Sequence, residues 1–321
     1  MISTRNTQYQ IETPAERCSW IILFFLALLS SLIGDLFILV ASVGRNALKL
    51  NQFLVVVIQH IAICDLLRSL VFLLPTMVSL IANGWVFGET LAYLIFFFNL
   101  VTFEANNLLL CILTTTKVLL LKSPDRTRYW CVGGIHVACV FVWMSSFVHP
   151  VLSLVDNQGI FFDYSVYHIF NEISSFWMFI VLKVVVVIAM LIPILMVIMA
   201  TTVTSCYLFK SRNAAKRSGG RIRWHGIVTV TATAIVYCCS IVPLAAFFVL
   251  FLLDINFKSI ALRRISEFLT TLNIVSNFYI YYVTIPSFRN FVKSKATTSV
   301  STTLSYLSTL RRMRNDDSTA L

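Results

Sequence analysis

The chain consists of seven long, mostly apolar stretches separated by short polar segments. The apolar stretches cover residues 19–43, 53–82, 90–121, 130–154, 174–209, 225–253 and 260–285. As a helix, each is long enough to cross the ~30 Å hydrocarbon core of a bilayer, which takes about 20 apolar residues. Because a backbone in lipid must satisfy its polar groups internally, stretches of this length predict helices rather than barrel strands. We therefore expect an all-α membrane protein with a bundle of seven transmembrane helices.

The composition excludes the soluble classes of protein. Of the 321 residues, 58% are hydrophobic and only 12% are charged, whereas soluble domains average roughly 45–50% apolar and about 25% charged residues. The serine, histidine and acidic side chains show no spacing typical of a nucleophile and its base. The expected protein is therefore not an enzyme, and we expect no cofactor and no metal.

The charge distribution orients the predicted bundle. The net charge is +11, and most Lys and Arg residues gather in segments 44–52, 122–129 and 210–224 and after residue 285. Basic loops face the cytoplasm, so we expect an extracellular N-terminus and a cytoplasmic C-terminus, in the plasma membrane. A basic inner face suits the anionic headgroups of a lipid bilayer, so the positive charge does not indicate that the protein binds nucleic acid.

This orientation divides the chain into three parts. Residues 1–18 are expected to form an extracellular tail, and residues 19–295 the membrane domain with a short helix at its end. Residues 296–321 then form a cytoplasmic tail that is rich in Ser and Thr.

Motifs in the second and seventh predicted helices narrow the class of protein. The second contains Ile-Ala-Ile-Cys-Asp-Leu-Leu at 61–67, and the seventh contains Asn277-Phe-Tyr-Ile-Tyr281 followed by Phe288 and Arg289. This ordered set resembles the rhodopsin-like (family A) G-protein-coupled receptors. Those receptors carry Leu-Ala-x-x-Asp-Leu, Asn-Pro-x-x-Tyr and a Phe-Arg start to a short amphipathic eighth helix. The resemblance implies a receptor that passes the binding of an extracellular ligand to a heterotrimeric G protein.

The chain departs from the family pattern at several functional positions. The Asp-Arg-Tyr of the third helix aligns with Thr116-Lys117-Val118, and the Pro of Asn-Pro-x-x-Tyr aligns with Phe278. The Trp of the sixth helix aligns with Ile241, and the Cys at the outer end of the third helix aligns with Ala92. The chain thus resembles a diverged receptor of the invertebrate orphan type, with a peptide or a small chemosensory molecule as ligand.

The resemblance also implies an ion site around the carboxylate of the second helix. That carboxylate is Asp65, and the polar groups available beside it are Asn106, Asn273 and Asn277. In the family this position helps to hold a sodium ion. Asp35 stands at the family's first-helix Asn, so two carboxylates are expected close together. The alternative is a hydrogen-bonded packing knot that holds no ion.

Candidate ligand-binding residues come from the charged and polar positions of the predicted helices. They are Arg68, Asn99, Glu104, Lys183, Glu267 and Thr271. Asn99 aligns with the family's amine-binding Asp, which argues against a monoamine as the ligand. Thr271 aligns with the retinal-binding Lys of opsins, which argues against retinal as the ligand. Arg68 either forms a structural pair with Glu104 or Asp65, or meets an anionic group of the ligand such as a peptide carboxylate.

Three residues are expected to carry activation and coupling. They are Lys117 at the inner end of the third helix, Pro243 as the hinge of the sixth and Tyr281 in the seventh. A lysine cannot copy the planar bidentate contacts of the family's Arg, so we expect either raised basal signalling or weak coupling. A snorkelling lysine is the structural alternative.

The cytoplasmic tail suggests two further protein partners. Phosphorylation of the Ser/Thr-rich tail would create an acidic strip suited to arrestin, and Thr319-Ala320-Leu321 fits the C-terminal pattern that PDZ domains bind.

A transporter would show inverted repeats, which the two halves of the sequence do not. A receptor-like decoy or scaffold that activates no G protein fits the altered Thr116-Lys117-Val118 and remains the main alternative.

Overall fold

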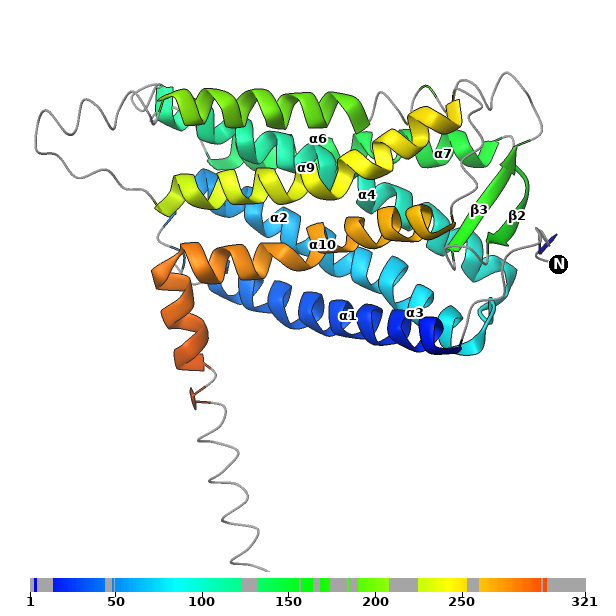
Figure 1. Ribbon diagram of the computed structural model, residues 1–321. Helices are drawn as coiled ribbons and strands as arrows, with labels where there is room; N and C mark the ends of the chain where they lie inside the picture. Colours follow the sequence, from blue (N-terminus) through cyan, green and yellow to red (C-terminus); the bar gives the residue numbers. More distant parts are fainter. Residues whose placement is uncertain are drawn as a thin grey trace, which may run out of the picture.

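The computed structural model shows a bundle of long helices with a small sheet at one end (Figure 1). It describes residues 3–4, 14–43, 48, 50–122, 132–155, 157–163, 168–173, 184, 190–207, 225–252, 260–295 and 297–298. The N-terminus lies beside the sheet, and a short helix leaves the bundle at the opposite end (Figure 1).

Long helices occupy the predicted apolar stretches wherever these are described. In chain order they are α1 (Pro14–Val43), α2 (Gln52–Arg68), η1 (Ser69–Leu73), α3 (Leu74–Ala82), α4 (Gly88–Lys122), α6 (Val132–Ser145), α7 (Val148–Val155), a helix over Met190–Tyr207, α9 (His225–Leu252) and α10 (Ile260–Thr284).

Five helical segments within the described residues are long and apolar enough to cross a membrane. They are Pro14–Val43, Gln52–Ala82, Gly88–Leu120, Val132–Leu154 and Met190–Tyr207. The chain is therefore a multi-pass membrane protein. The other two predicted spans are helical as well, but α9 contributes an apolar helix only over Thr231–Ala246, and α10 carries Arg, Glu, Thr and Asn side chains among its 25 residues.

Prolines explain the two interruptions within predicted spans. Between α2 and α3 the chain forms a π-helical turn, η1, where the Leu74 N–H bonds to the Ser69 carbonyl. Pro75 follows directly; its ring has no N–H and would clash with the carbonyl four residues earlier in an α-helix, so a widened turn absorbs the mismatch. The predicted fourth span is likewise divided into α6 and α7 just before Pro150.

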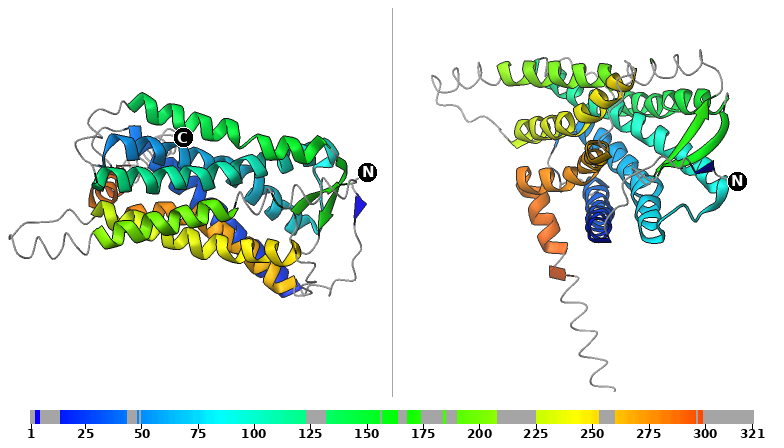
Figure 2. Two further views of the ribbon diagram at one scale, coloured as in Figure 1. Left: turned by 90° about the horizontal axis from the view of Figure 1, so that it is seen from above. Right: turned by 45° about the vertical axis from the view of Figure 1, so that its right-hand side comes forward.

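A small sheet at the N-terminal end was not predicted from the sequence. Strands β2 (Asn157–Asp163) and β3 (His168–Ile173) pair antiparallel, and β1 (Ser3–Thr4) adds to β2 in parallel. The hairpin follows α7 in the chain and lies at the same end as the start of α1 (Figure 2). This end of the bundle therefore has a structured cover.

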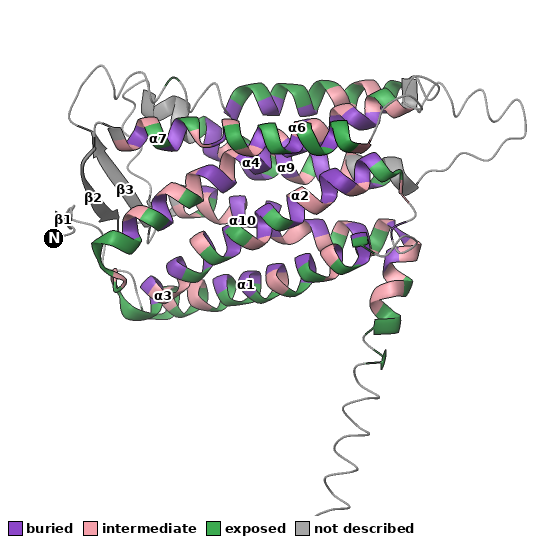
Figure 3. Cartoon of the chain, turned by 180° about the vertical axis from the view of Figure 1, so that it is seen from behind, coloured by how far each residue is buried: buried purple, intermediate pink, exposed green. Residues whose placement is uncertain are grey.

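Burial follows the helix period, as expected for a bundle in lipid. On α1 the apolar side chains Ile22, Leu26, Ile33 and Val40 point outward, each more than half exposed. The opposite face of α1 packs inward, as the alternating stripes along the helix show (Figure 3). Exposed apolar residues repeated three or four positions apart form a surface suited to lipid rather than to water.

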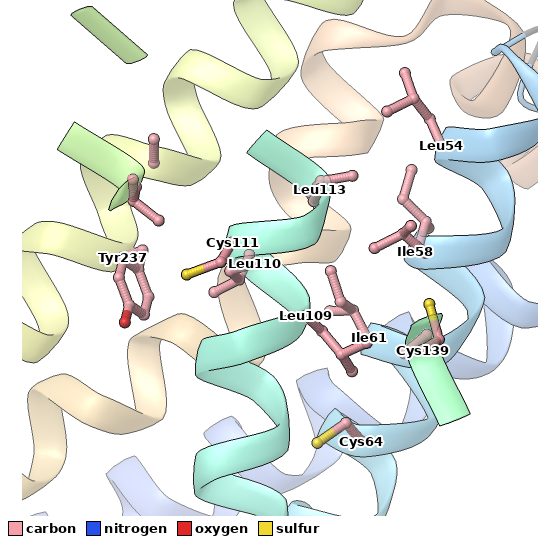
Figure 4. Close-up of a cluster of buried hydrophobic side chains, with 14 of the residues drawn as sticks. Leu54, Ile58, Ile61, Cys64, Leu109, Leu110, Cys111, Leu113, Cys139 and Tyr237 are labelled. Atoms are coloured by element: carbon pink, nitrogen blue, oxygen red, sulfur yellow. The ribbon is translucent and has the colours of Figure 1, made fainter. Parts of the chain in front are cut away.

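The interior contains two groups of buried apolar residues. The larger, which we call the main cluster, joins α2, α4, α6, α9 and α10; Figure 4 shows Leu109 and Leu113 of α4 near Ile58 and Ile61 of α2. The second, which we call the sheet-end cluster, contains aromatic residues of α1, η1, α4 and α10. Its buried members are Phe24, Ala27, Leu28, Phe72, Leu73, Leu80, Ala92 and Phe96, with Trp20, Trp85 and Phe268 packed against them.

A short helix over residues 286–295 forms where the sequence predicts an amphipathic eighth helix. It begins at Pro286, a residue favoured in the first helical turn because its missing N–H has no helical partner there. Phe288 is fully buried, whereas Lys293 and Lys295 are exposed. The Phe288 ring packs edge-on against Tyr281 and Phe278, which fixes this helix to the end of α10.

Candidate functional site

A buried carboxylate joins three helices in the middle of the bundle. Asp65 of α2 is fully buried and accepts hydrogen bonds from two amide groups. The Asn106 Nδ2 of α4 donates to Asp65 Oδ1, and the Asn277 Nδ2 of α10 donates to Asp65 Oδ2 at 2.8 Å. Of the four residues predicted to lie together, Asp65, Asn106 and Asn277 are joined by hydrogen bonds. The side chain of the fourth, Asn273, makes no hydrogen bond among the described residues.

Two serines connect a second carboxylate to this network. The Ser31 Oγ of α1 donates to Asp35 Oδ2 at 2.8 Å and lies 2.6 Å from Ser69 Oγ, which contacts the Asp65 carbonyl at 2.8 Å. In the contact between the two serines, either hydroxyl group can be the donor. Asp35 and Asp65 also interact electrostatically, as the expected proximity of the two carboxylates implies.

The oxygens around Asp65 have the chemistry of a small-cation site. The amide oxygens of Asn106 and Asn277 are buried without a hydrogen-bond partner, as are both side-chain polar atoms of Asn273. Uncharged amide oxygens beside a carboxylate are ligands that hard cations accept. Among the described residues no group of three His, Cys, Asp or Glu side chains suits a metal ion, so a cation would rely on these amide oxygens.

Arg68 lies one helical turn from Asp65, at the border between the two apolar clusters. Its guanidinium carbon is 4.9 Å from the centre of the Phe103 ring and 5.6 Å from that of Phe72. Nη2 donates a long hydrogen bond of 3.5 Å to Thr270 Oγ1, and Nε is buried without a partner. Asp65 and Glu267 act on this guanidinium electrostatically.

Glu104 pairs with a histidine that the sequence analysis did not select. The His149 Nδ1 of α7 and Glu104 Oε1 of α4 lie 2.5 Å apart, and both side chains are almost buried. The pair of Arg68 with Glu104 considered from the sequence is therefore wrong, because Glu104 faces α7 while Arg68 faces α10. Among the described residues the hydrogen bond of Arg68 goes to Thr270 rather than to Asp65, and Asp65 acts on the guanidinium only electrostatically.

We expect the Glu104–His149 contact to couple α4 to α7 energetically. Replacing His149 by alanine leaves a carboxylate inside the bundle, which costs about 3–5 kcal/mol when a buried partner is removed. Glu104→Gln retains a hydrogen-bond acceptor and should cost about 1–2 kcal/mol. In a double-mutant cycle measured by thermal unfolding of the purified protein, the two changes should be non-additive by more than 1 kcal/mol. Additive effects would show that the contact contributes nothing.

Lys117 and Tyr281 lie toward the end of the bundle that bears the short helix, whereas Pro243 lies in the half of α9 nearer the sheet. Lys117 of α4 is 4% exposed, and its Nζ has no hydrogen-bond partner among the described residues. Tyr281 of α10 is 1% exposed, and its hydroxyl is likewise unpartnered. Pro243 lies inside α9, which continues as one helix through it.

The remaining predicted ligand residues do not form one group. Asn99 lies on α4, and its carbonyl accepts a hydrogen bond from Thr102 Oγ1. Thr271 of α10 is fully buried and bonds to the Phe268 carbonyl within its own helix. Glu267, one turn before Thr271, is partly exposed. Lys183 and the tail residues 319–321 lie outside the described residues.

Sequence reasoning missed the partners that complete these groups. Ser31, Ser69 and His149 are ordinary residues in apolar helices when read one at a time. A signal was available for His149, because an acid such as Glu104 in the middle of an apolar stretch needs a partner. The comparisons with known proteins add no identification: no family model and no curated protein matches the chain.

Proposed function

We propose that this protein is a plasma-membrane receptor of the rhodopsin-like type. It would span the membrane seven times with the N-terminus outside, bind an extracellular peptide or small chemosensory molecule, and activate a heterotrimeric G protein at the cytoplasmic face. The proposal is supported by the order of motifs along the chain and by one structural observation. That observation is the buried Asp65 with its two amide partners on α4 and α10.

The Asp65 network suits a switch because it contains more acceptors than donors. Asn106 and Asn277 each use their amide nitrogen on Asp65, and each has a buried oxygen without a partner. Buried polar groups of this kind favour any rearrangement that gives them a partner. A sodium ion held by Asp65, Asn106, Asn273 and Asn277 would balance the carboxylate charge within the bundle. These residues hold α2, α4 and α10 in one arrangement and leave a second arrangement accessible.

A ligand would act on this switch by preferring one arrangement. It stabilises the signalling state only by the difference between its affinities for the two states. In the proposed signalling state α9 moves outward about Pro243, and the buried Tyr281 hydroxyl finds a new partner. The cytoplasmic end then opens, and Lys117 becomes accessible to the G protein. Arrestin and a PDZ-domain protein are proposed as later partners of the cytoplasmic tail.

The test is ligand-independent G-protein activation in heterologous cells, with wild type and Lys117→Ala compared at matched surface expression. A contact made by a charged donor is worth about 1.5–3 kcal/mol, so basal output should fall about tenfold or more in Lys117→Ala. The control is Leu119→Ala, since Leu119 is an exposed residue close to Lys117 on α4; its output should match wild type.

Output no higher than in empty cells for all three proteins would contradict G-protein activation. It would favour the alternative, a receptor-like decoy or scaffold that activates no G protein. Arrestin recruitment in the same cells would then show whether any transducer is engaged.

A further inference from the structure

We infer that Arg68 receives the carboxylate of an amphipathic ligand whose aromatic or aliphatic body lies along the sheet-end cluster. This inference rests on the proposed receptor function and names the chemical class of its ligand. It starts from an arginine that the bundle buries without giving it a carboxylate partner by hydrogen bonding.

The guanidinium of Arg68 has unused donors on one edge. The side chain is 3% exposed. Within the described part of the chain, Nε has no hydrogen-bond partner and Nη2 makes only the 3.5 Å contact to Thr270 Oγ1. Nε and Nη2 together form one of the two edges of a guanidinium that bind both oxygens of a carboxylate at once. A buried cation of this kind is costly unless it is paired, so the binding of an anionic group here is strongly favoured.

The protein's own carboxylates do not fulfil this role. Glu104 pairs with His149, and Asp65 accepts hydrogen bonds from Asn106 and Asn277. Asp65 and Glu267 act on the Arg68 guanidinium electrostatically, yet its hydrogen bond goes to Thr270 on α10. Among the described residues, the Nε donor of Arg68 has no hydrogen-bond partner.

The surroundings of the guanidinium define the rest of the ligand. The guanidinium carbon lies over the Phe103 and Phe72 rings, 4.9 Å and 5.6 Å from their centres. Phe72 also belongs to the sheet-end cluster, where Trp20, Phe24 and Phe268 pack against one another with ring centres 5.6–6.3 Å apart. A carboxylate at Arg68 therefore places an attached apolar body among aromatic side chains.

Two hydroxyl groups add a polar requirement. Thr76 Oγ1 and Ser79 Oγ on α3 are buried without partners, on the segment that continues from Phe72 toward the sheet end of the bundle. Thr76 follows Arg68 by eight helical residues, about 12 Å along the axis, so these hydroxyl groups offer hydrogen bonds to a polar group farther along the ligand than the carboxylate. The C-terminal residues of a peptide combine a carboxylate, aromatic or aliphatic side chains and further amide groups along such a length.

The test uses two probes that differ only in charge, N-acetyl-phenylalanine and N-acetyl-phenylalaninamide. Binding to the purified full-length protein in lipid nanodiscs is measured by titration of tryptophan fluorescence, because Trp20 and Trp85 pack on the sheet-end cluster. The acid should bind at least about tenfold more tightly than the amide, as expected for one charge-assisted bidentate contact. Arg68→Gln should abolish this preference, and Arg68→Lys, which keeps the charge but loses the fork, should weaken it severalfold.

Lys293→Gln is the control, because it removes a cation exposed on the short helix at the opposite end of the bundle from the sheet and should leave the preference unchanged. Equal binding of the two probes by wild type, or binding of neither up to about 10 mM, overturns the inference even if Arg68→Gln fails to fold. A preference that persists in Arg68→Gln also overturns it. Because the readout is binding alone, a clear preference without any G-protein activation would refute the proposed signalling and leave the ligand class in place.

Discussion

Replacing Gly34 by alanine will destabilise this protein by about 2–3 kcal/mol, in the upper range of overpacking effects. A Cβ added at Gly34 of α1 would lie 2.7 Å from Cβ and 2.9 Å from Cγ of Phe278 on α10. The Phe278 Cβ is attached to the backbone and cannot rotate away, so the two helices must separate. Small residues at such crossings let membrane helices approach closely. Melting temperature and surface expression should both fall.

The control reverses the sign of the effect. Gly133 is exposed in the first turn of α6, where alanine has no neighbour to displace and is at least as favourable for a helix as glycine. Gly133→Ala should therefore leave the melting temperature unchanged or raise it. In a Phe278→Gly background, where the opposing Cβ is gone, Gly34→Ala should lose most of its cost. A cost that stays the same in that background would show that the contact with Phe278 is not its cause.

The close contact between Gly34 and Phe278 shows what the sequence could not reveal. The sequence shows Phe278 within an apolar stretch, and the hydropathy pattern predicts both helices. Which side chain fills the space between α1 and α10 depends on a contact across more than 240 positions, for which a hydropathy pattern carries no signal. The pairing of residues 3–4 with β2 was missed for the same reason, because it is non-local. The β2–β3 pairing is local, but it falls between two predicted membrane spans.

The helices were predictable because a bilayer imposes a strong local rule on composition. The exact starts and interruptions of the helices were harder to predict. For example, α1 begins at Pro14, five residues before the predicted apolar stretch, because its first turn contains polar residues such as Glu16. In the site, Asp65, Asn106 and Asn277 were found from motif order, and they do meet. Glu104 was found as a residue needing a partner, but its partner His149 was not.

Replacing Asp65 by leucine will destabilise the protein strongly, whereas asparagine will be tolerated. Leucine leaves the amide nitrogens of Asn106 and Asn277 buried without acceptors, and each such group costs about 1–3 kcal/mol. Asparagine offers one oxygen and one nitrogen in the same shape. Because the Asn106 and Asn277 oxygens are unpartnered, one of these amides can turn over and accept a hydrogen bond from the new nitrogen. Surface expression and melting temperature should rank wild type, Asp65→Asn and then Asp65→Leu.

The asparagine variant therefore separates the charge of Asp65 from its hydrogen bonds. If the buried oxygens hold sodium, wild type should melt at a higher temperature in sodium chloride than in N-methylglucamine chloride of equal ionic strength. A concentration ten times the dissociation constant would contribute about 1.4 kcal/mol. Asp65→Asn should melt at the same temperature in both salts, because amide oxygens alone leave the cation without a counter-charge. Equal melting of wild type in the two salts would instead favour a packing knot, and an unchanged sodium effect in Asp65→Asn would place the ion elsewhere.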